Sequence, residues 1–213
     1  MTNRMNRTTP LLAAAAASLA LIAAPAAAIP LPAPASAPAP AKVEQLVRVA
    51  LTTTMGRIVL DLDRGRAPIT TANFLHYIDS GRFNGIGFYR AMKSGPGGLI
   101  QGGITDDARK LFPAIKHEPT TKTGLKNVAG VIAMANGGPG TAHSDFFIMT
   151  SDFPSLDATA TNAGFAAFGH VVEGMDVAKA ILAAPVSPTQ GEGAMKGQML
   201  EPMVRIVKAE RVK

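Results

Sequence analysis

The stretches Phe88-Tyr89-Arg90 and Gln101-Gly102-Gly103 decide the fold, together with Met134-Ala135-Asn136-Gly137-Gly138 and Ser144-Asp145-Phe146-Phe147 further along the chain. Each lies in or beside a short apolar run, and glycines stand where two backbones would approach closely. Such runs are typical of short strands. The strands would carry Arg90 and Gln101, which are eleven residues apart in the sequence, next to apolar positions.

Alternating apolar and polar residues predict further strands on both sides of these stretches. Val43–Leu51 and Arg57–Asp63 should form a hairpin around the turn at Thr53–Gly56. The other strands are predicted at 85–90, 98–101, 130–135, 145–150, 166–172 and 202–211. Many short strands at regular intervals favour an antiparallel barrel or a sandwich, and the pattern alone leaves both open.

Two helices and one long loop interrupt the strands. Pro68 can start a helix and Gly81 can end it, and a second short helix should follow Gly174. Residues 104–127 hold few apolar positions and two prolines. We therefore predict a long surface loop there.

The N-terminal segment has the three parts of a secretory signal peptide. Arg4 and Arg7 precede the apolar run Leu11–Ala24, and small residues follow at 26–28. We predict a signal peptide at 1–28, a Pro/Ala-rich linker at 29–42 and a folded domain at 43–213. The alternative, an uncleaved membrane anchor, is disfavoured because the run is short, rich in alanine and interrupted by Pro25.

Composition excludes or disfavours several kinds of functional site. The chain has 213 residues and no cysteine, which excludes disulfides, thiolate zinc sites and cysteine nucleophiles. Removing Arg4 and Arg7 leaves 19 basic and 15 acidic residues, a net charge of +4. The chain has no run of basic residues that would indicate a nucleic-acid site. The four histidines are scattered without metal-ligand spacing, so no metal site is predicted.

The motifs, in this order, resemble those of the cyclophilin-type peptidyl-prolyl cis-trans isomerases. The resemblance extends over nearly the whole domain, through Ala67-Pro68, Asn73-Phe74, the stretches quoted above, Gly124-Leu125-Lys126-Asn127, Phe168-Gly169 and Val172-Glu173-Gly174-Met175-Asp176-Val177. It implies a mainly β fold, a closed eight-stranded antiparallel β-barrel capped by two α-helices. It also implies a proline-binding groove on the outer surface and isomerase activity without a cofactor.

The resemblance implies two catalytic residues. Arg90 would donate a hydrogen bond to the prolyl nitrogen, and Gln101 would contact substrate and hold the arginine, while Gly102 and Gly103 would let a peptide approach. Isomerisation makes and breaks no bond to substrate, so one well-placed donor suffices. The positions that would bind substrate are Tyr89, Leu99, Ala135, Asn136, Asp145, Phe147, Leu156 and Phe165.

Some of these positions depart from the family pattern. Tyr89 and Phe165 stand where many members carry histidine, and Asp145 stands in place of a second groove glutamine. The segment Ser94–Gly98 is about three residues longer than usual. Near Gly98 the family commonly places a phenylalanine that forms a pocket wall, and this chain offers none.

The resulting hypothesis is an exported, monomeric prolyl isomerase that acts on proline-containing polypeptides in the periplasm of a Gram-negative bacterium. It would have no stable membrane anchor after signal cleavage. The alternative is a catalytically weak cyclophilin-like module that binds peptides as a chaperone or scaffold, which Asp145 and the longer segment would favour. An unrelated chemistry on the same barrel is a third possibility that a fold alone does not exclude.

Overall fold

A closed antiparallel sheet makes up most of the structure, a computed structural model that describes residues 45–213. The predicted signal peptide and linker, and residues 43 and 44, lie outside the described residues. The strands are β1 (Leu46–Thr53), β2 (Gly56–Asp63), β3 (Gly87–Ser94), β4 (Gly97–Gly103), β5 (Val131–Met134), β6 (Phe146–Met149), β7 (Ala166–Glu173), β8 (Val186–Ser187) and β9 (Met199–Arg211).

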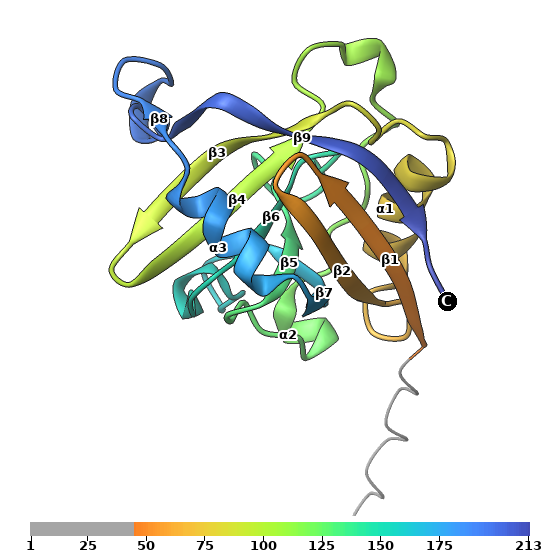
Figure 1. Cartoon of the computed structure of the whole chain (residues 1–213). Coiled ribbons are helices and arrows are strands. Elements are labelled where there is room, and N and C mark those ends of the chain that lie inside the picture. The colour runs from red at the N-terminus through yellow and green to blue at the C-terminus, as the bar shows by residue number, and fades with distance from the viewer. Residues whose placement is uncertain (1–44) are drawn as a thin grey trace, which may run out of the picture. The chain divides into compact units, whose positions relative to one another are not determined.

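Eight of these nine strands close into a barrel. Their order in the sheet is β1-β2-β7-β5-β6-β4-β3-β9-β8, and β1 also pairs with β9, from Val49 opposite Arg211 to Thr53 opposite Ile206. The two-residue β8 adds to the outer edge of β9 (Figure 1). The prediction of an eight-stranded antiparallel barrel is therefore confirmed.

Two longer helices lie on opposite sides of the barrel (Figure 1). They are α1 (Pro68–Asp79), with proline in its first turn, and α3 (Met175–Ala183), which follows Gly174 in a left-handed conformation at φ +82°. The structure adds a one-turn helix, α2 (Thr120–Thr123), that the sequence did not predict. Within residues 45–213, no helix is long and apolar enough to cross a membrane.

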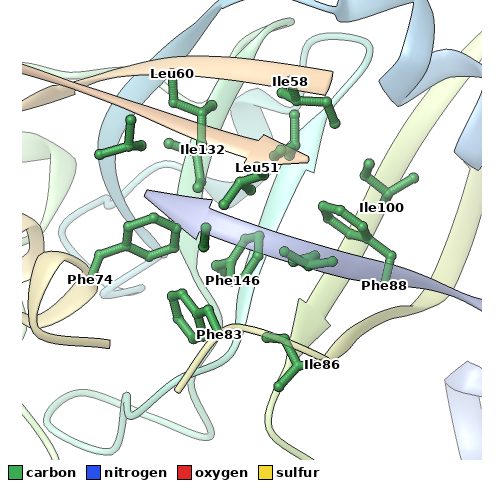
Figure 2. Packing of buried hydrophobic residues seen from close by; sticks show 14 of the residues in the cluster. Leu51, Ile58, Leu60, Phe74, Phe83, Ile86, Phe88, Ile100, Ile132 and Phe146 are labelled. Carbon is green, nitrogen blue, oxygen red and sulfur yellow. The ribbon is translucent and has the colours of Figure 1, made fainter. Parts of the chain in front are cut away.

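Aromatic rings from distant parts of the chain fill the barrel. Phe74 of α1 lies 5.0 Å from Phe83, 5.1 Å from Phe146 and 5.2 Å from Phe168, measured between ring centroids. All four side chains are fully buried, and Figure 2 shows Phe74, Phe83 and Phe146 pointing toward one another beneath the aliphatic side chains of β1 and β2. Inward residues alternate with outward ones along the regular parts of the strands, as the period of a strand requires.

The segment 104–127 is more than the surface loop that we predicted. It contains α2 and the 3₁₀ turn η1 (Ala108–Lys110). The buried carboxylate of Glu118 accepts hydrogen bonds at 2.8 Å from both the backbone N–H and the hydroxyl of Thr70. A carboxylate at the first turn of a helix accepts a hydrogen bond from an N–H that the helix leaves unpaired, and its charge interacts favourably with the helix dipole. This contact therefore ties the segment to α1.

We expect Phe74→Ala to lower the free energy of unfolding by about 3 to 5 kcal/mol, because it removes the ring that the other three aromatic rings contact. Val207→Ala, at a β9 position whose side chain is 59% exposed, should change it by less than about 0.5 kcal/mol. Urea unfolding of both variants measures the difference. Equal losses in the two variants would contradict this account of the core.

Candidate functional site

A β-bulge in β3 turns two consecutive side chains to the outside of the barrel. The register of β3 against β4 shifts between Phe88 and Arg90, while Phe88 and Ala91 on either side belong to the core. The side chains of Tyr89 and Arg90 both reach Gln101 on the outer face of β4, at 2.6 and 2.9 Å. Bulges commonly re-aim side chains in this way beside functional sites.

Below these polar groups lies an apolar hollow of about 350 Å³ on the outer face of β3, β4 and β6, which we call the central hollow. Leu99 and Phe147 form its buried floor, and the Phe165 ring meets the Phe147 ring edge-on at 5.3 Å. This apolar cluster is separate from the barrel core. The hollow is lined by Arg90, Met92, Leu99, Gln101, Ala135, Asn136, Phe147, Leu156, Phe165 and Met195.

A directed series of hydrogen bonds orients the rim of the central hollow. The Tyr89 hydroxyl donates to Asp145 Oδ1 at 2.6 Å and accepts from Gln101 Nε2 at 2.6 Å. Gln101 Oε1 then accepts from Arg90 Nη1 at 2.9 Å. A carboxylate only accepts hydrogen bonds, so Asp145 requires Tyr89 to donate to it. The Tyr89 oxygen is then left to accept from the amide nitrogen of Gln101, which turns the amide oxygen toward Arg90.

Arg90 is held by neutral partners on both sides. Its Nε donates to Gln198 Oε1 at 2.9 Å, and its Nη1 donates to Gln101. Among the described residues no carboxylate forms an ion pair with it. Partial burial lowers the pKa of Arg90, but an arginine stays charged at neutral pH. The guanidinium is therefore fixed in place, with its charge not neutralised by the protein.

The comparison with known sequences agrees with this geometry. The family described as cyclophilin type peptidyl-prolyl cis-trans isomerase/CLD matches residues 48–211. The chain belongs to this family. It is 40% identical over 137 residues to peptidyl-prolyl cis-trans isomerase A of Dickeya dadantii (strain 3937), an alignment that covers 62% of this chain and 70% of the relative.

Two further comparisons agree with this family and with the fold. It is 39% identical over 143 residues to a peptidyl-prolyl cis-trans isomerase of Acinetobacter baylyi, with 65% of this chain and 73% of the relative covered. The crystal structure of a cyclophilin-type isomerase from Cryptosporidium parvum shares the fold, with a TM-score of 0.64 at 22% identity. That match covers 79% of this chain and 98% of the other.

The structure brings eight of the ten predicted site residues of this cyclophilin to the central hollow. The other two, Tyr89 and Asp145, do not line it. Tyr89 accepts a hydrogen bond from Gln101, and Asp145 accepts one from Tyr89. Tyr89 and Asp145 each line a neighbouring hollow. The hollow beside Asp145 has about 260 Å³ and shares Gln101, Ala135 and Asn136 with the central one.

Three residues at the site were missed by sequence reasoning: Met92, Met195 and Gln198. Alternation along β3 could have found Met92, which stands two residues after Arg90 and so on the same face. Nothing local marked Gln198, which is 108 residues from its partner Arg90. Met195 belongs to the 3₁₀ turn η3 (Gly193–Met195) in a segment without a recognisable motif.

The glycines after Gln101 have a different role from the one we predicted. Gly102 and Gly103 are buried, and the chain's own atoms fill the space above them. At Gly103, where φ is +155°, an added Cβ would lie 2.7 Å from Cγ of Asp145. The missing side chain thus makes room for Asp145 behind Gln101 rather than for a peptide.

The longer segment 94–98 does not replace the missing wall of the central hollow. Ser94 pairs with Gly97 around a two-residue turn at Gly95 and Pro96, so the added residues lengthen the β3–β4 hairpin. The apolar side chains of Met92 and Met195 line the central hollow instead.

Burial raises the pKa of Asp145, against the hydrogen bonds from Tyr89 and Ser144, which lower it. Burial also raises the pKa of the Tyr89 hydroxyl, and the nearby Asp145 charge raises it further. Tyr89 therefore stays protonated at neutral pH and remains a donor. Ionising Asp145 therefore costs more free energy in the folded protein than in the unfolded chain.

The raised pKa of Asp145 predicts how the free energy of unfolding depends on pH. The pKa of Asp145 is raised on folding, so its stabilising contribution is full below the unfolded pKa and is lost as pH rises through the folded pKa. Asp145→Asn cannot ionise and lacks this loss. We expect its free energy of unfolding to rise relative to that of the native protein as the pH increases above the unfolded pKa of about 4, as measured by urea unfolding. A difference that stays constant with pH would contradict the raised pKa.

Proposed function

We propose that this protein accelerates the cis–trans isomerisation of Xaa-Pro peptide bonds, with Arg90 as the donor that stabilises the twisted transition state. One observation carries the proposal: a guanidinium held in place by the amide oxygens of Gln101 and Gln198 stands at the rim of an apolar hollow of about 350 Å³. The hollow can hold a pyrrolidine ring by apolar contact, and the guanidinium can donate a hydrogen bond to the nitrogen of that ring.

The required rate enhancement is within reach of one donor. Rotation about the peptide C–N bond has a barrier of about 18–20 kcal/mol, and uncatalysed prolyl isomerisation takes tens to hundreds of seconds. Reaching about 10 turnovers per second means lowering that barrier by roughly 4 kcal/mol. In the twisted state the nitrogen loses resonance and becomes an acceptor, and a preorganised donor contributes about 3–4 kcal/mol.

The other site residues have supporting roles in this proposal. Leu99, Phe147, Leu156 and Phe165 hold the proline ring by apolar contact, while Ala135 and Asn136 border the path of the peptide backbone. Gln101 contacts substrate and fixes Arg90. Tyr89 and Asp145 act through Gln101, because their hydrogen bonds determine which end of its amide faces the arginine.

We expect Arg90→Ala to lower the rate of isomerisation by roughly 100-fold or more, because it removes the transition-state donor. Exchange NMR on a short Xaa-Pro peptide measures this rate. Arg64→Ala, at an exposed position in the turn between β2 and α1, is the matched control and should retain the native rate.

Two other outcomes are informative. Acceleration that survives in the Arg90→Ala variant would remove Arg90 from the mechanism. If neither protein accelerates the reaction and peptide binding is still detected, the protein is a binding module of the chaperone or scaffold type.

Export is the second part of the proposed function. The basic residues, apolar run and small residues within 1–28 support a cleaved signal peptide. The mature isomerase would then act in the periplasm, as a monomer, on proline-containing segments of exported proteins during their folding.

We expect the mature protein to begin at Ile29, because cleavage should follow Ala28. N-terminal sequencing of the protein recovered from the cell envelope of an expressing Gram-negative host checks this start. An intact Met1 on the mature chain would instead indicate a retained anchor or no export.

A further inference from the structure

A second apolar hollow adjoins the central one on the side of β9, and we call it the methionine hollow. It has about 460 Å³, and its lining combines four large apolar side chains with four uncharged polar ones: Met195, Met199, Leu200 and Met203, and Tyr89, Gln101, Thr105 and Gln190. Met199 and Met203 are four residues apart on β9, so their side chains lie on the same face of the strand. Met195 comes from η3.

The methionine hollow shares two lining residues with the proposed proline site. Gln101 and Met195 line both hollows. A peptide whose proline occupies the central hollow therefore has a neighbouring residue within reach of the methionines, across the side chain of Gln101. The hollow beside Asp145 also has Gln101 in its lining, and it shares Ala135 and Asn136 with the central hollow.

The lining of the methionine hollow suits an apolar ligand. Met195 is 39% exposed and Met203 is 45% exposed, which leaves large apolar side chains in contact with water. Single apolar residues on a surface are ordinary, whereas several converging on one hollow indicate a binding site. Thioether side chains are flexible and polarisable, so they adapt to partners of different shape. None of the lining residues is ionised at neutral pH, which disfavours a charged ligand.

The wall that separates the two hollows is held in place. The segment that carries Met195 folds back on itself, with the N–H of Gly197 donating to the carbonyl of Gln190 at 2.9 Å. Gln198 joins this segment to the site, because its Nε2 donates to the carbonyl of Ala194 at 2.8 Å and its Oε1 accepts from Arg90. The position of Met195 is therefore fixed relative to Arg90.

On the basis of the proposed function, we infer that the methionine hollow is a specificity subsite that binds a large apolar side chain, such as leucine, methionine or phenylalanine, flanking the proline of the same peptide. Burying that side chain against the methionines adds binding free energy in proportion to the apolar area removed from water. The substrates favoured by this enzyme then carry a large apolar residue within a few positions of proline.

A series of alanine-based peptides tests this subsite. Each peptide carries one proline, and a single leucine replaces alanine at one of three positions on either side of it. Exchange NMR gives kcat/KM for each peptide, relative to the peptide without leucine. We expect one leucine position to raise kcat/KM by about tenfold, since the hollow is partly open and buries the side chain incompletely.

The double variant Met199→Gln, Met203→Gln keeps side-chain length but makes the hollow polar, and it should bring that ratio to about one. Met55→Gln is the matched control, because Met55 is 42% exposed and lines none of the three hollows. It should keep the tenfold preference. Circular dichroism checks that both variants are folded.

The results distinguish failure of the subsite from failure of the proposed function. If the native protein accelerates all peptides equally, or if the double variant keeps the leucine preference, the subsite is overturned and the isomerase stands. If no peptide in the series is isomerised, the proposed function itself fails and the subsite falls with it.

Discussion

The pairing of β1 with β9 is the constraint on which the rest of the structure depends. It joins the first and last of the eight barrel strands, so every strand of the barrel has one face toward a closed interior and one toward solvent or a covering segment. Large aromatic side chains occupy the interior. The residues available for binding are consequently those on the outer face, and the candidate site is a surface groove rather than a cavity within the barrel.

On that outer face, neutral hydrogen bonds position a charged group. The carboxylate of Asp145 stands two side chains away from the guanidinium of Arg90, separated from it by Tyr89 and Gln101. A direct ion pair would have offset the charge of the arginine and used its donors. The intervening hydroxyl and amide orient the guanidinium without that loss, so an acidic residue near the site leaves the charge of Arg90 uncompensated.

The sequence was sufficient for the fold and for most of the site. Alternating residues located the barrel strands, and the family resemblance assigned ten site residues, eight of which the structure collects around one hollow. The features that sequence reasoning missed depend on contacts between segments far apart in the chain. The bulge that turns Tyr89 and Arg90 to the same face, the bond from Arg90 to Gln198, and the anchoring of 104–127 through Glu118 each involve partners with no local signal.

The methionines around the groove also expose it to oxidants. A thioether takes up oxygen to become a sulfoxide, which is polar and is restored by dedicated reductases. The chain contains no cysteine that would react first. Oxidation of Met195, Met199 or Met203 would make the methionine hollow more polar, while Arg90, Gln101, Tyr89 and Asp145 would keep their hydrogen bonds. Methionine oxidation would thus change the polarity of the methionine hollow and leave the hydrogen bonds around Arg90 intact.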